Sequence, residues 1–130
     1  MIFGTGVDIV EISRIAKIID KWGTGFAEKI LAENELATFL QLHQQKPDRA
    51  INFLAKRFAS KEACAKAFGT GFRQGLAFTH IMVEHDDLGK PLLAFQATAQ
   101  AMYQHNKIVN THLSLSDEQR YVVAFVILEI

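Results

Sequence analysis

Two hydrophobic periods alternate along the chain and divide it into predicted strands and helices. Where apolar positions recur every second residue, or form a short run rich in β-branched side chains, the pattern predicts a β-strand. The predicted strands are Ile2–Val10, His80–Glu84, Pro91–Ala94, His112–Ser116 and Tyr121–Ile130. The turn residues Asp86 to Gly89 stand between the second and third strands, so we expect the third strand to run back along the second.

Helix start and stop signals place the predicted helices between these strands. Ser13 is a suitable N-cap for the first helix, which Gly23 closes. Pro47 opens a long helix that Gly69 ends. The predicted helices run from Ser13 to about Trp22, over Phe26–Gln45 as one or two helices, from Pro47 to Gly69, and over Gln96–His105. The predicted fold class is α+β, with a mainly antiparallel sheet packed against the long helix.

Length and composition limit the classes of protein that this sequence can be. The 130 residues suit a single domain, residues 1–130, and a hydrophobic fraction of 49% is enough for a substantial core. The 14 Lys and Arg residues balance 14 Asp and Glu residues, so no global charge indicates a nucleic acid or a membrane as partner. A charge-driven partner must therefore be recognised by a local patch.

The cysteine content and the apolar segments favour a cytoplasmic protein. Cys64 is the one cysteine, which excludes an internal disulfide framework and a multi-cysteine metal site. Helical spacing places Cys64 in the core rather than beside Glu62. The N-terminal segment lacks the basic leader and the cleavage site of a signal peptide. The longest apolar run, Tyr121–Leu128, is too short to cross a bilayer.

The segment RFASKEACAKAFGTG, residues 57–71, carries the first candidate chemistry. Glu62 and Lys66 are four residues apart and share a helix face. They form either a surface ion pair or a site in which Glu62 binds a metal ion and Lys66 a phosphate. The second alternative needs another carboxylate, and Asp8 is the candidate. Asp8 lies in an apolar strand, where a charge is costly to bury unless it is paired or bound to a cation; the plainer interpretation is a strand-end aspartate at a turn.

The glycines after this helix and the polar residues of the fourth strand also have a plain interpretation. Gly69 and Gly71 either end the helix or allow the backbone to approach a ligand closely. His112 and Ser114 alternate with apolar residues, which predicts two solvent-facing side chains.

The first predicted helix carries a basic stripe formed by Arg14, Lys17 and Lys21, within about 60° of arc. The predicted core face of this helix consists of Ile15, Ile19 and Trp22. Ile18 falls between the two faces. The stripe is either a solvated helix face or a docking surface for an acidic partner, to which Ile18 would add an apolar contact.

Taken in order along the chain, these motifs resemble the holo-acyl-carrier-protein synthases, the short type of phosphopantetheinyl transferase. Three blocks carry the resemblance, GTGVDIVEISRI at 4–15, RFASKEACAKAFGTG at 57–71 and HLSLSDEQRYVVAFVILE at 112–129, together with the short GKP at 89–91. The resemblance implies the phosphopantetheinyl transferase fold. It also implies transfer of 4′-phosphopantetheine from coenzyme A to a serine of apo acyl carrier protein, with adenosine 3′,5′-bisphosphate as the other product.

The resemblance further implies a role in fatty acid biosynthesis, Mg²⁺ as cofactor and a homotrimer with active sites between subunits. Mn²⁺ would suit the same oxygen ligands. Asp8 and Glu62 match the metal-binding carboxylates and Lys66 the phosphate contact, so these three are the expected catalytic residues. The metal would neutralise charge on the phosphoryl oxygens, and either Glu62 through a metal-bound water or Asp8 would take the serine proton.

Two further residue sets follow from the resemblance. Coenzyme A contacts are expected from Arg57, Lys61, Gly69, Gly89, Pro91, His112 and Ser114. Because acyl carrier proteins are acidic, carrier docking is expected from Arg14, Lys17, Ile18 and Lys21.

Helix geometry separates two of the expected coenzyme contacts from the metal site. Arg57 and Lys61 lie ~100–140° around the helix from Glu62 and Lys66, so one helix cannot easily point all four at one phosphate. We therefore expect Arg57 and Lys61 to serve the site of a neighbouring subunit, with His112, near the 3′-phosphate and adenosine.

Without the family resemblance, the residues are also compatible with two other classes of protein. One is a non-catalytic oligomeric module that binds an acidic helical partner through the first helix. A pure interaction module has no need for Asp8 in its apolar strand. The other is a metal-dependent hydrolase of a nucleotide pyrophosphate, which product analysis without a carrier protein would separate from a transferase.

Overall fold

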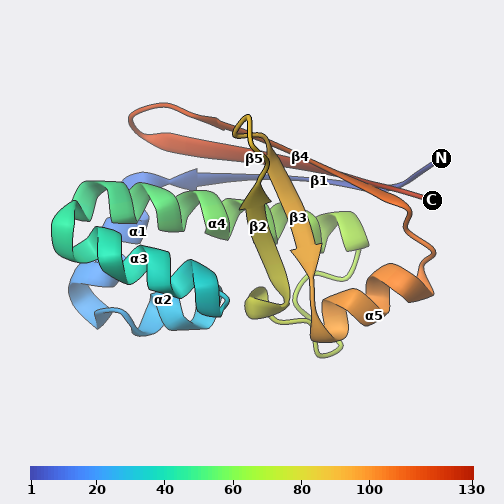
Figure 1. Ribbon diagram of the computed structural model, residues 1–130, viewed down its shortest axis with the longest axis horizontal. Coiled ribbons are helices and arrows are strands. Elements are labelled where there is room, and N and C mark those ends of the chain that lie inside the picture. The colour runs from blue at the N-terminus through green and yellow to red at the C-terminus, as the bar shows by residue number, and fades with distance from the viewer.

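A computed structural model describes all residues, 1–130, and shows a long helix lying along a sheet of long strands (Figure 1). The elements are β1 (Ile2–Glu11), α1 (Ile12–Trp22), α2 (Gly25–Ile30), α3 (Glu33–Gln45), α4 (Pro47–Phe68), the 3₁₀ turn η1 (Phe78–His80), β2 (Ile81–His85), β3 (Pro91–Phe95), α5 (Ala97–His105), β4 (Asn110–Asp117) and β5 (Tyr121–Glu129). The predicted α+β class is confirmed, and the segment after Gly23 forms two helices.

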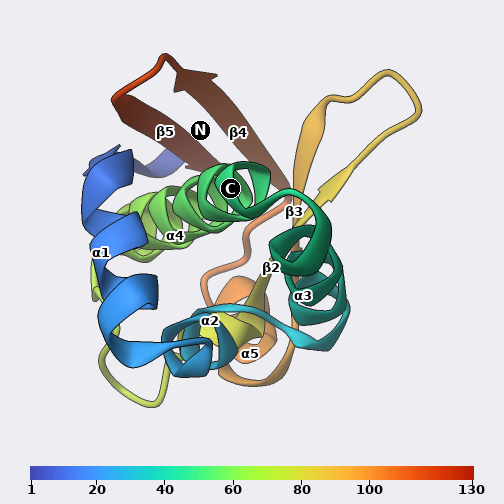
Figure 2. The same ribbon diagram turned by 90° about the vertical axis from the view of Figure 1, so that its left-hand side faces the viewer.

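The strands form two antiparallel sheets. In the three-stranded sheet β5 lies between β1 and β4, with Asp8 opposite Ala124 and Val7 opposite Phe125. The second sheet is the hairpin of β2 and β3, whose loop projects away from the helices (Figure 2). The two termini meet at one end of the large sheet, where the Met1 amino group donates a hydrogen bond to the Ile130 carbonyl at 2.9 Å (Figure 1).

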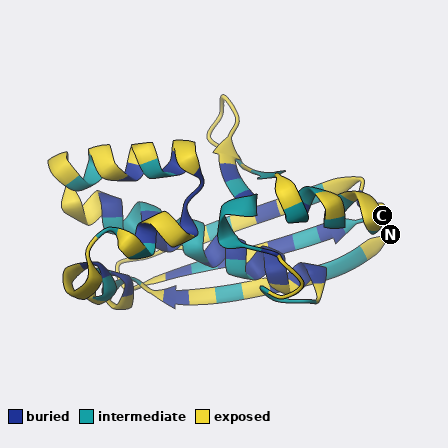
Figure 3. Ribbon diagram, turned by 90° about the horizontal axis from the view of Figure 1, so that it is seen from below, coloured by how far each residue is buried: buried dark blue, intermediate teal, exposed yellow.

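Alternating burial along the long strands shows which face of the large sheet is packed (Figure 3). Along β5, Val122, Ala124, Val126 and Leu128 are buried beneath α4, whereas the residues between them are more exposed. The α4 side of this contact is rich in buried alanines, and Cys64 is buried among them as predicted. Burial raises the pKa of the Cys64 thiol, so Cys64 is a core residue and not a nucleophile.

Two glycines bring β1 into contact with the backbone of α4. A Cβ atom at Gly6 would lie 1.9 Å from the Ala63 carbonyl oxygen, and one at Gly4 would lie 2.0 Å from that of Ala67. Any side chain at either position would push the strand away from the helix, since both obstacles are backbone atoms. The close approach places Asp8, two residues after Gly6, beside the last turns of α4.

Two details of α1 differ from the sequence prediction. The helix begins at Ile12, directly after β1, and Ser13 is not its N-cap; the Ser13 hydroxyl donates to the Glu11 carboxylate at 2.8 Å. Trp22 is not part of the core, since 69% of it is exposed. Trp22 is the last residue of α1 and extends past the core contact that Ile15 and Ile19 make.

None of the helices has the length and apolar character needed to cross a membrane.

Candidate active site

Asp8 and Lys66 meet where β1 passes the C-terminal part of α4. The Lys66 ammonium lies 3.0 Å from Asp8 Oδ1 and donates a second hydrogen bond to the Val7 carbonyl at 3.0 Å. Asp8 is therefore not a strand-end aspartate at a turn; it lies inside β1, with its side chain only 16% exposed. Lys66 pairs with this aspartate across the fold and not with Glu62 one helical turn away.

Glu62 belongs to the same cluster of charges. Its side chain is half-buried, and burial raises the pKa of its carboxyl group. The negative charge of Asp8 raises that pKa further, whereas Lys66 and Arg14 oppose the shift. The effect of Asp8 on Glu62 places the two carboxylates near each other. Arg14 reaches this site from the first turn of α1, which follows β1 without a loop.

Two carboxylates that repel each other are a suitable donor set for a hard divalent cation, because a cation turns their repulsion into attraction. No cluster of three or more His, Cys, Asp or Glu side chains that could hold a metal ion occurs in the chain. Asp8 and Glu62 thus fit a cation such as Mg²⁺, which proteins commonly hold through one or two carboxylates and the substrate's phosphates rather than in an all-protein cage.

The backbone at the end of α4 turns sharply next to this cluster. Gly69 ends the helix in the left-handed conformation, with φ of 86°, and its N–H donates to the Lys66 carbonyl. Gly71 also has a positive φ, 62°. A Cβ atom would meet nothing at either position, so the backbone conformation alone explains why both residues are glycine.

Lys61 is not where the sequence prediction placed it. Lys61 is fully buried, and its ammonium donates to Glu35 Oε1 at 2.6 Å and to the Ile30 carbonyl at 2.6 Å. An ammonium held in this way cannot reach a coenzyme at the surface, so the predicted coenzyme contact of Lys61 is wrong. The cause is Glu35 on α3, which the sequence reasoning missed. One signal in the sequence could have indicated that Glu35 is buried: it stands four residues before Phe39 and therefore shares the core face of α3.

Arg57 shares the Lys61 side of α4, facing α3 and β2 instead of β1. Its side chain is 11% exposed, and its Nε lies 3.8 Å from Glu35 Oε2. The guanidinium carbon lies 4.0 Å from the centre of the Phe53 ring. The predicted separation of Arg57 and Lys61 from Glu62 and Lys66 is therefore confirmed within this chain.

The predicted contacts on β4 and on the hairpin lie apart from the carboxylates. His112 and Ser114 are exposed on the face of the large sheet that points away from α4, and the His112 ring is hydrogen-bonded to the Glu129 carboxylate. Asp8 is on the opposite face. Gly89 forms the hairpin turn with φ of 85°, and Pro91 begins β3, which packs beside β4. One chain alone therefore does not gather all the predicted coenzyme contacts around Asp8 and Glu62.

The basic stripe of α1 is exposed as predicted, and it borders a shallow groove. The lining residues are Glu11, Ser13, Arg14, Lys17, Ile18, Lys21 and Trp22. A neighbouring hollow continues the apolar part of this surface, with Ile18, Trp22 and Phe26 in its lining. The Lys21 ammonium lies 5.1 Å from the centre of the Trp22 ring. The surface thus combines positive charge with exposed apolar area. The contribution of Trp22 to this surface was not predicted, because the helical spacing assigned Trp22 to the core.

Comparisons with known proteins show the family of the chain. The family model of the 4′-phosphopantetheinyl transferase superfamily matches residues 4–126. The chain is similar to a holo-[acyl-carrier-protein] synthase of Vibrio parahaemolyticus, with 50% identity over 128 residues and 98% of each chain covered. It is also similar to the crystal structure of holo-[acyl-carrier-protein] synthase from Neisseria meningitidis, with a TM-score of 0.90, 44% identity and 100% of both chains covered.

A third similar structure carries a ligand. It is a holo-(acyl-carrier-protein) synthase from Bacillus anthracis in complex with coenzyme A (3′,5′-ADP), which has a TM-score of 0.80 and 41% identity. The match covers 98% of this chain and 96% of that one.

Proposed function

The chain belongs to the 4′-phosphopantetheinyl transferase superfamily, and we propose that it transfers 4′-phosphopantetheine from coenzyme A to a serine of apo acyl carrier protein. The products are holo carrier protein and adenosine 3′,5′-bisphosphate, and the reaction supports fatty acid biosynthesis. The observation that carries the proposal is the cluster of Asp8, Glu62 and Lys66 between β1 and α4. The sequence likeness over the whole chain to holo-[acyl-carrier-protein] synthases supports it.

The chemistry is a phosphoryl transfer. The serine oxygen forms a bond to the phosphorus that carries pantetheine, and the bond from that phosphorus to the bridging oxygen of the pyrophosphate breaks. Catalysis of such a step is mainly positioning and charge stabilisation. Lys66, whose side chain is 51% exposed, can stabilise the leaving bisphosphate. Asp8 and Glu62 are the two carboxylates of the cluster that can accept the serine proton.

Asp8 and Glu62 would also hold the divalent cation, Mg²⁺ or Mn²⁺. When bound, the cation neutralises negative charge that builds on the phosphoryl oxygens. The support for this assignment is the raised pKa of Glu62, which is due first to burial of its carboxyl group and second to the negative charge of Asp8.

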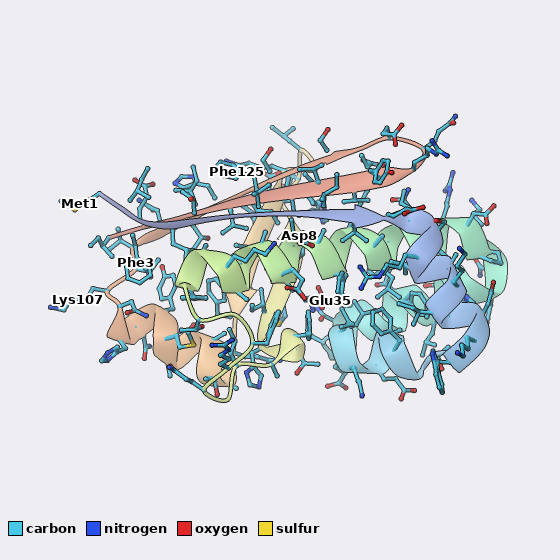
Figure 4. All side chains as sticks on the ribbon, turned by 180° about the vertical axis from the view of Figure 1, so that it is seen from behind. Met1, Phe3, Asp8, Glu35, Lys107 and Phe125 are labelled. Carbon is cyan, nitrogen blue, oxygen red and sulfur yellow. The ribbon has the colours of Figure 1, made fainter.

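The coenzyme site is proposed to be completed by a second subunit of a homotrimer. The proposed contacts are Arg57, Gly69, Gly89, Pro91, His112 and Ser114. Two facts favour a composite site: His112 and Ser114 lie on the face of the sheet opposite Asp8, and that uncovered face also carries exposed apolar side chains. Val7 is 55%, Ile9 63% and Phe125 41% exposed on it; Figure 4 shows Phe125 on the side of the sheet away from α4. Exposed apolar surface of this kind is typical of an interface.

The carrier protein is proposed to dock on α1. Arg14, Lys17, Lys21 and the half-buried Ile18 border the groove described above, and positive charge there complements an acidic partner. Arg14 lies close enough to Glu62 for its positive charge to oppose the rise in the pKa of that carboxyl group, so a carrier docked on α1 would deliver its serine beside the carboxylates. A cytoplasmic location remains a prediction from the sequence.

The experiment that tests the proposed function is chromatography of coenzyme A and its products. We expect adenosine 3′,5′-bisphosphate to form only when apo acyl carrier protein and Mg²⁺ are both present, and to disappear with a chelator. Cleavage of coenzyme A without a carrier protein would indicate a hydrolase. Intact coenzyme A with several carrier proteins would indicate a binding module.

A further inference from the structure

The Glu35 carboxylate joins three parts of the fold through one buried group (Figure 4). Oε1 accepts hydrogen bonds from the Lys61 ammonium at 2.6 Å and from the Ala32 N–H at 2.9 Å. Oε2 accepts one from the Val83 N–H of β2 at 3.0 Å and faces Arg57 Nε at 3.8 Å. The side chain is only 3% exposed. Glu35 therefore fixes the start of α3, the middle of α4 and the hairpin relative to one another.

The charges of this cluster do not balance. Two cations, Lys61 and Arg57, share the single negative charge of Glu35. Lys61 is fully enclosed by Glu35 and the Ile30 carbonyl. Arg57 is enclosed less completely, and its Nε has no hydrogen-bond partner. Burial lowers the pKa of both groups, and Glu35 counteracts the shift in each case. The surplus positive charge is therefore located at Arg57.

Arg57 directs this charge into a groove on α4. The guanidinium is held between the Phe53 ring and Glu35. It lines a hollow of about 490 Å³ together with Leu42, Asp48, Arg49, Asn52, Phe53 and Lys56. Three of the lining residues, Arg49, Lys56 and Arg57, are cationic and one, Asp48, is anionic. Asp117, 3.5 Å from the Lys56 ammonium, offsets part of the positive charge, and the remaining excess favours an anion. The hairpin lies close by, since β2 packs against α4. Burial lowers the pKa of His85 at the end of β2, and the charges of Arg57 and Lys56 lower it further.

We propose that Glu35 is a positioning residue that orients Arg57 toward a phosphate of coenzyme A and holds the β2–β3 hairpin beside it. This proposal rests on the proposed function. Glu35 does not touch the coenzyme. Its carboxylate sets the direction in which the Arg57 guanidinium presents its free donors, and a guanidinium fixed in advance loses less entropy when it binds a phosphate. The 3′-phosphate is the group to which we assign this contact.

The test compares binding of coenzyme A and 3′-dephospho-coenzyme A by calorimetry. Glu35→Gln alone would leave two buried cations without a carboxylate, which endangers folding. The test pair is therefore Lys61→Met and Glu35→Gln/Lys61→Met, which differ only at residue 35. In Lys61→Met, Glu35 still faces Arg57, so the preference for coenzyme A over its dephospho form should persist. In the double variant, coenzyme A should bind about tenfold more weakly, while 3′-dephospho-coenzyme A binds as before.

Arg57→Ala separates a positioning role from a structural one. If Glu35 acts through Arg57, adding Glu35→Gln to a Lys61→Met chain should have no further effect on coenzyme A binding once Arg57 is alanine. Glu35→Asp keeps the buried charge and hence the fold, but withdraws the carboxylate by one methylene, and we expect a smaller loss of the same preference.

Three outcomes would overturn the proposal. One is an equal loss of affinity for both coenzymes on removal of Glu35, which would indicate a structural role only. Another is that Arg57→Ala abolishes the preference for coenzyme A over 3′-dephospho-coenzyme A, whereas the Glu35→Gln/Lys61→Met and Glu35→Asp variants both keep it unchanged. The third is a wild-type protein that binds neither coenzyme, which would overturn the proposed function as well.

Discussion

The Lys66 ammonium lies 3.0 Å from the Asp8 carboxylate, 58 residues away in sequence, and thereby joins α4 to β1 at the candidate active site. The contact exists because β1 touches the backbone of α4 at Gly4 and Gly6. The same approach brings Glu62 close enough for Asp8 to raise the pKa of its carboxyl group. The function proposed for the chain thus depends on backbone contact between one strand and one helix.

Gly6→Ala tests this dependence. The added Cβ would lie 1.9 Å from the Ala63 carbonyl oxygen, so β1 must move away from α4. We expect a loss of about 2 kcal/mol in the free energy of unfolding, and a loss of transferase activity in the fraction that stays folded. Urea denaturation and the transfer assay measure the two effects. Gly25→Ala is the control, because a Cβ at Gly25 meets nothing within 4 Å; it should change stability by less than about 1 kcal/mol. Equal stability of the two variants would contradict the proposed contact.

Lys17→Glu tests the docking surface on α1. Lys17 is exposed and lines the groove of the basic stripe. Lys17 is not among the charged residues that shift the pKa of Glu62, whereas Arg14 is. We expect the KM for the carrier protein to rise roughly tenfold, with kcat and the KM for coenzyme A nearly unchanged. Lys107→Glu makes the same charge change at an exposed site far from α1 (Figure 4) and should have no effect. Parallel changes in both KM values would argue against docking at α1.

Phe125→Glu tests the proposed homotrimer. Phe125 is 41% exposed on the uncovered face of the large sheet, and a carboxylate there would be buried without a partner in any assembly that uses this face. Light scattering should show a trimer for the wild type and a smaller species for the variant. Leu40→Glu is matched in exposure, since Leu40 is 40% exposed on α3, and should leave the trimer intact. A trimeric Phe125→Glu variant would exclude this face as the interface.

Mixing two inactive variants tests whether the site lies between subunits. Arg57→Ala and Glu62→Gln chains are each expected to be nearly inactive as homotrimers. After subunit exchange, some sites in hybrid trimers would combine an intact Arg57 with an intact Glu62, so activity should rise above the sum of the two. The control mixes Arg57→Ala chains with chains that carry both Arg57→Ala and Glu62→Gln. No site in these hybrids has an intact Arg57. No recovery after confirmed exchange would place Arg57 and Glu62 in the same subunit's site.

The order of the elements and the positions of the helix-ending glycines could be predicted from the sequence, because they depend on local periodicity and on turn chemistry. Gly23 and Gly69 end α1 and α4 as expected, both with positive φ. The separation of Glu62 from Arg57 also follows from the helical repeat alone.

Features that depend on packing between distant segments could not be predicted in this way. Nothing near Lys61 in the sequence indicates that Glu35, 26 residues earlier, draws its ammonium into the core. Likewise, the period of α1 assigns Trp22 to the core face, whereas the end of the α1 contact leaves it exposed. In both cases tertiary contacts overruled an expectation based on local spacing.

The most direct test of the proposed transfer is intact mass spectrometry of an apo acyl carrier protein after incubation with this protein, coenzyme A and Mg²⁺. We expect the carrier to gain the mass of one phosphopantetheine, a chelator to prevent the gain, and Glu62→Gln to slow it at least ~100-fold. Glu62→Gln should stay folded, because the amide removes a carboxylate that burial and Asp8 already disfavour. A carrier whose mass does not change, or a gain of mass that needs neither metal nor Glu62, would contradict the proposed function.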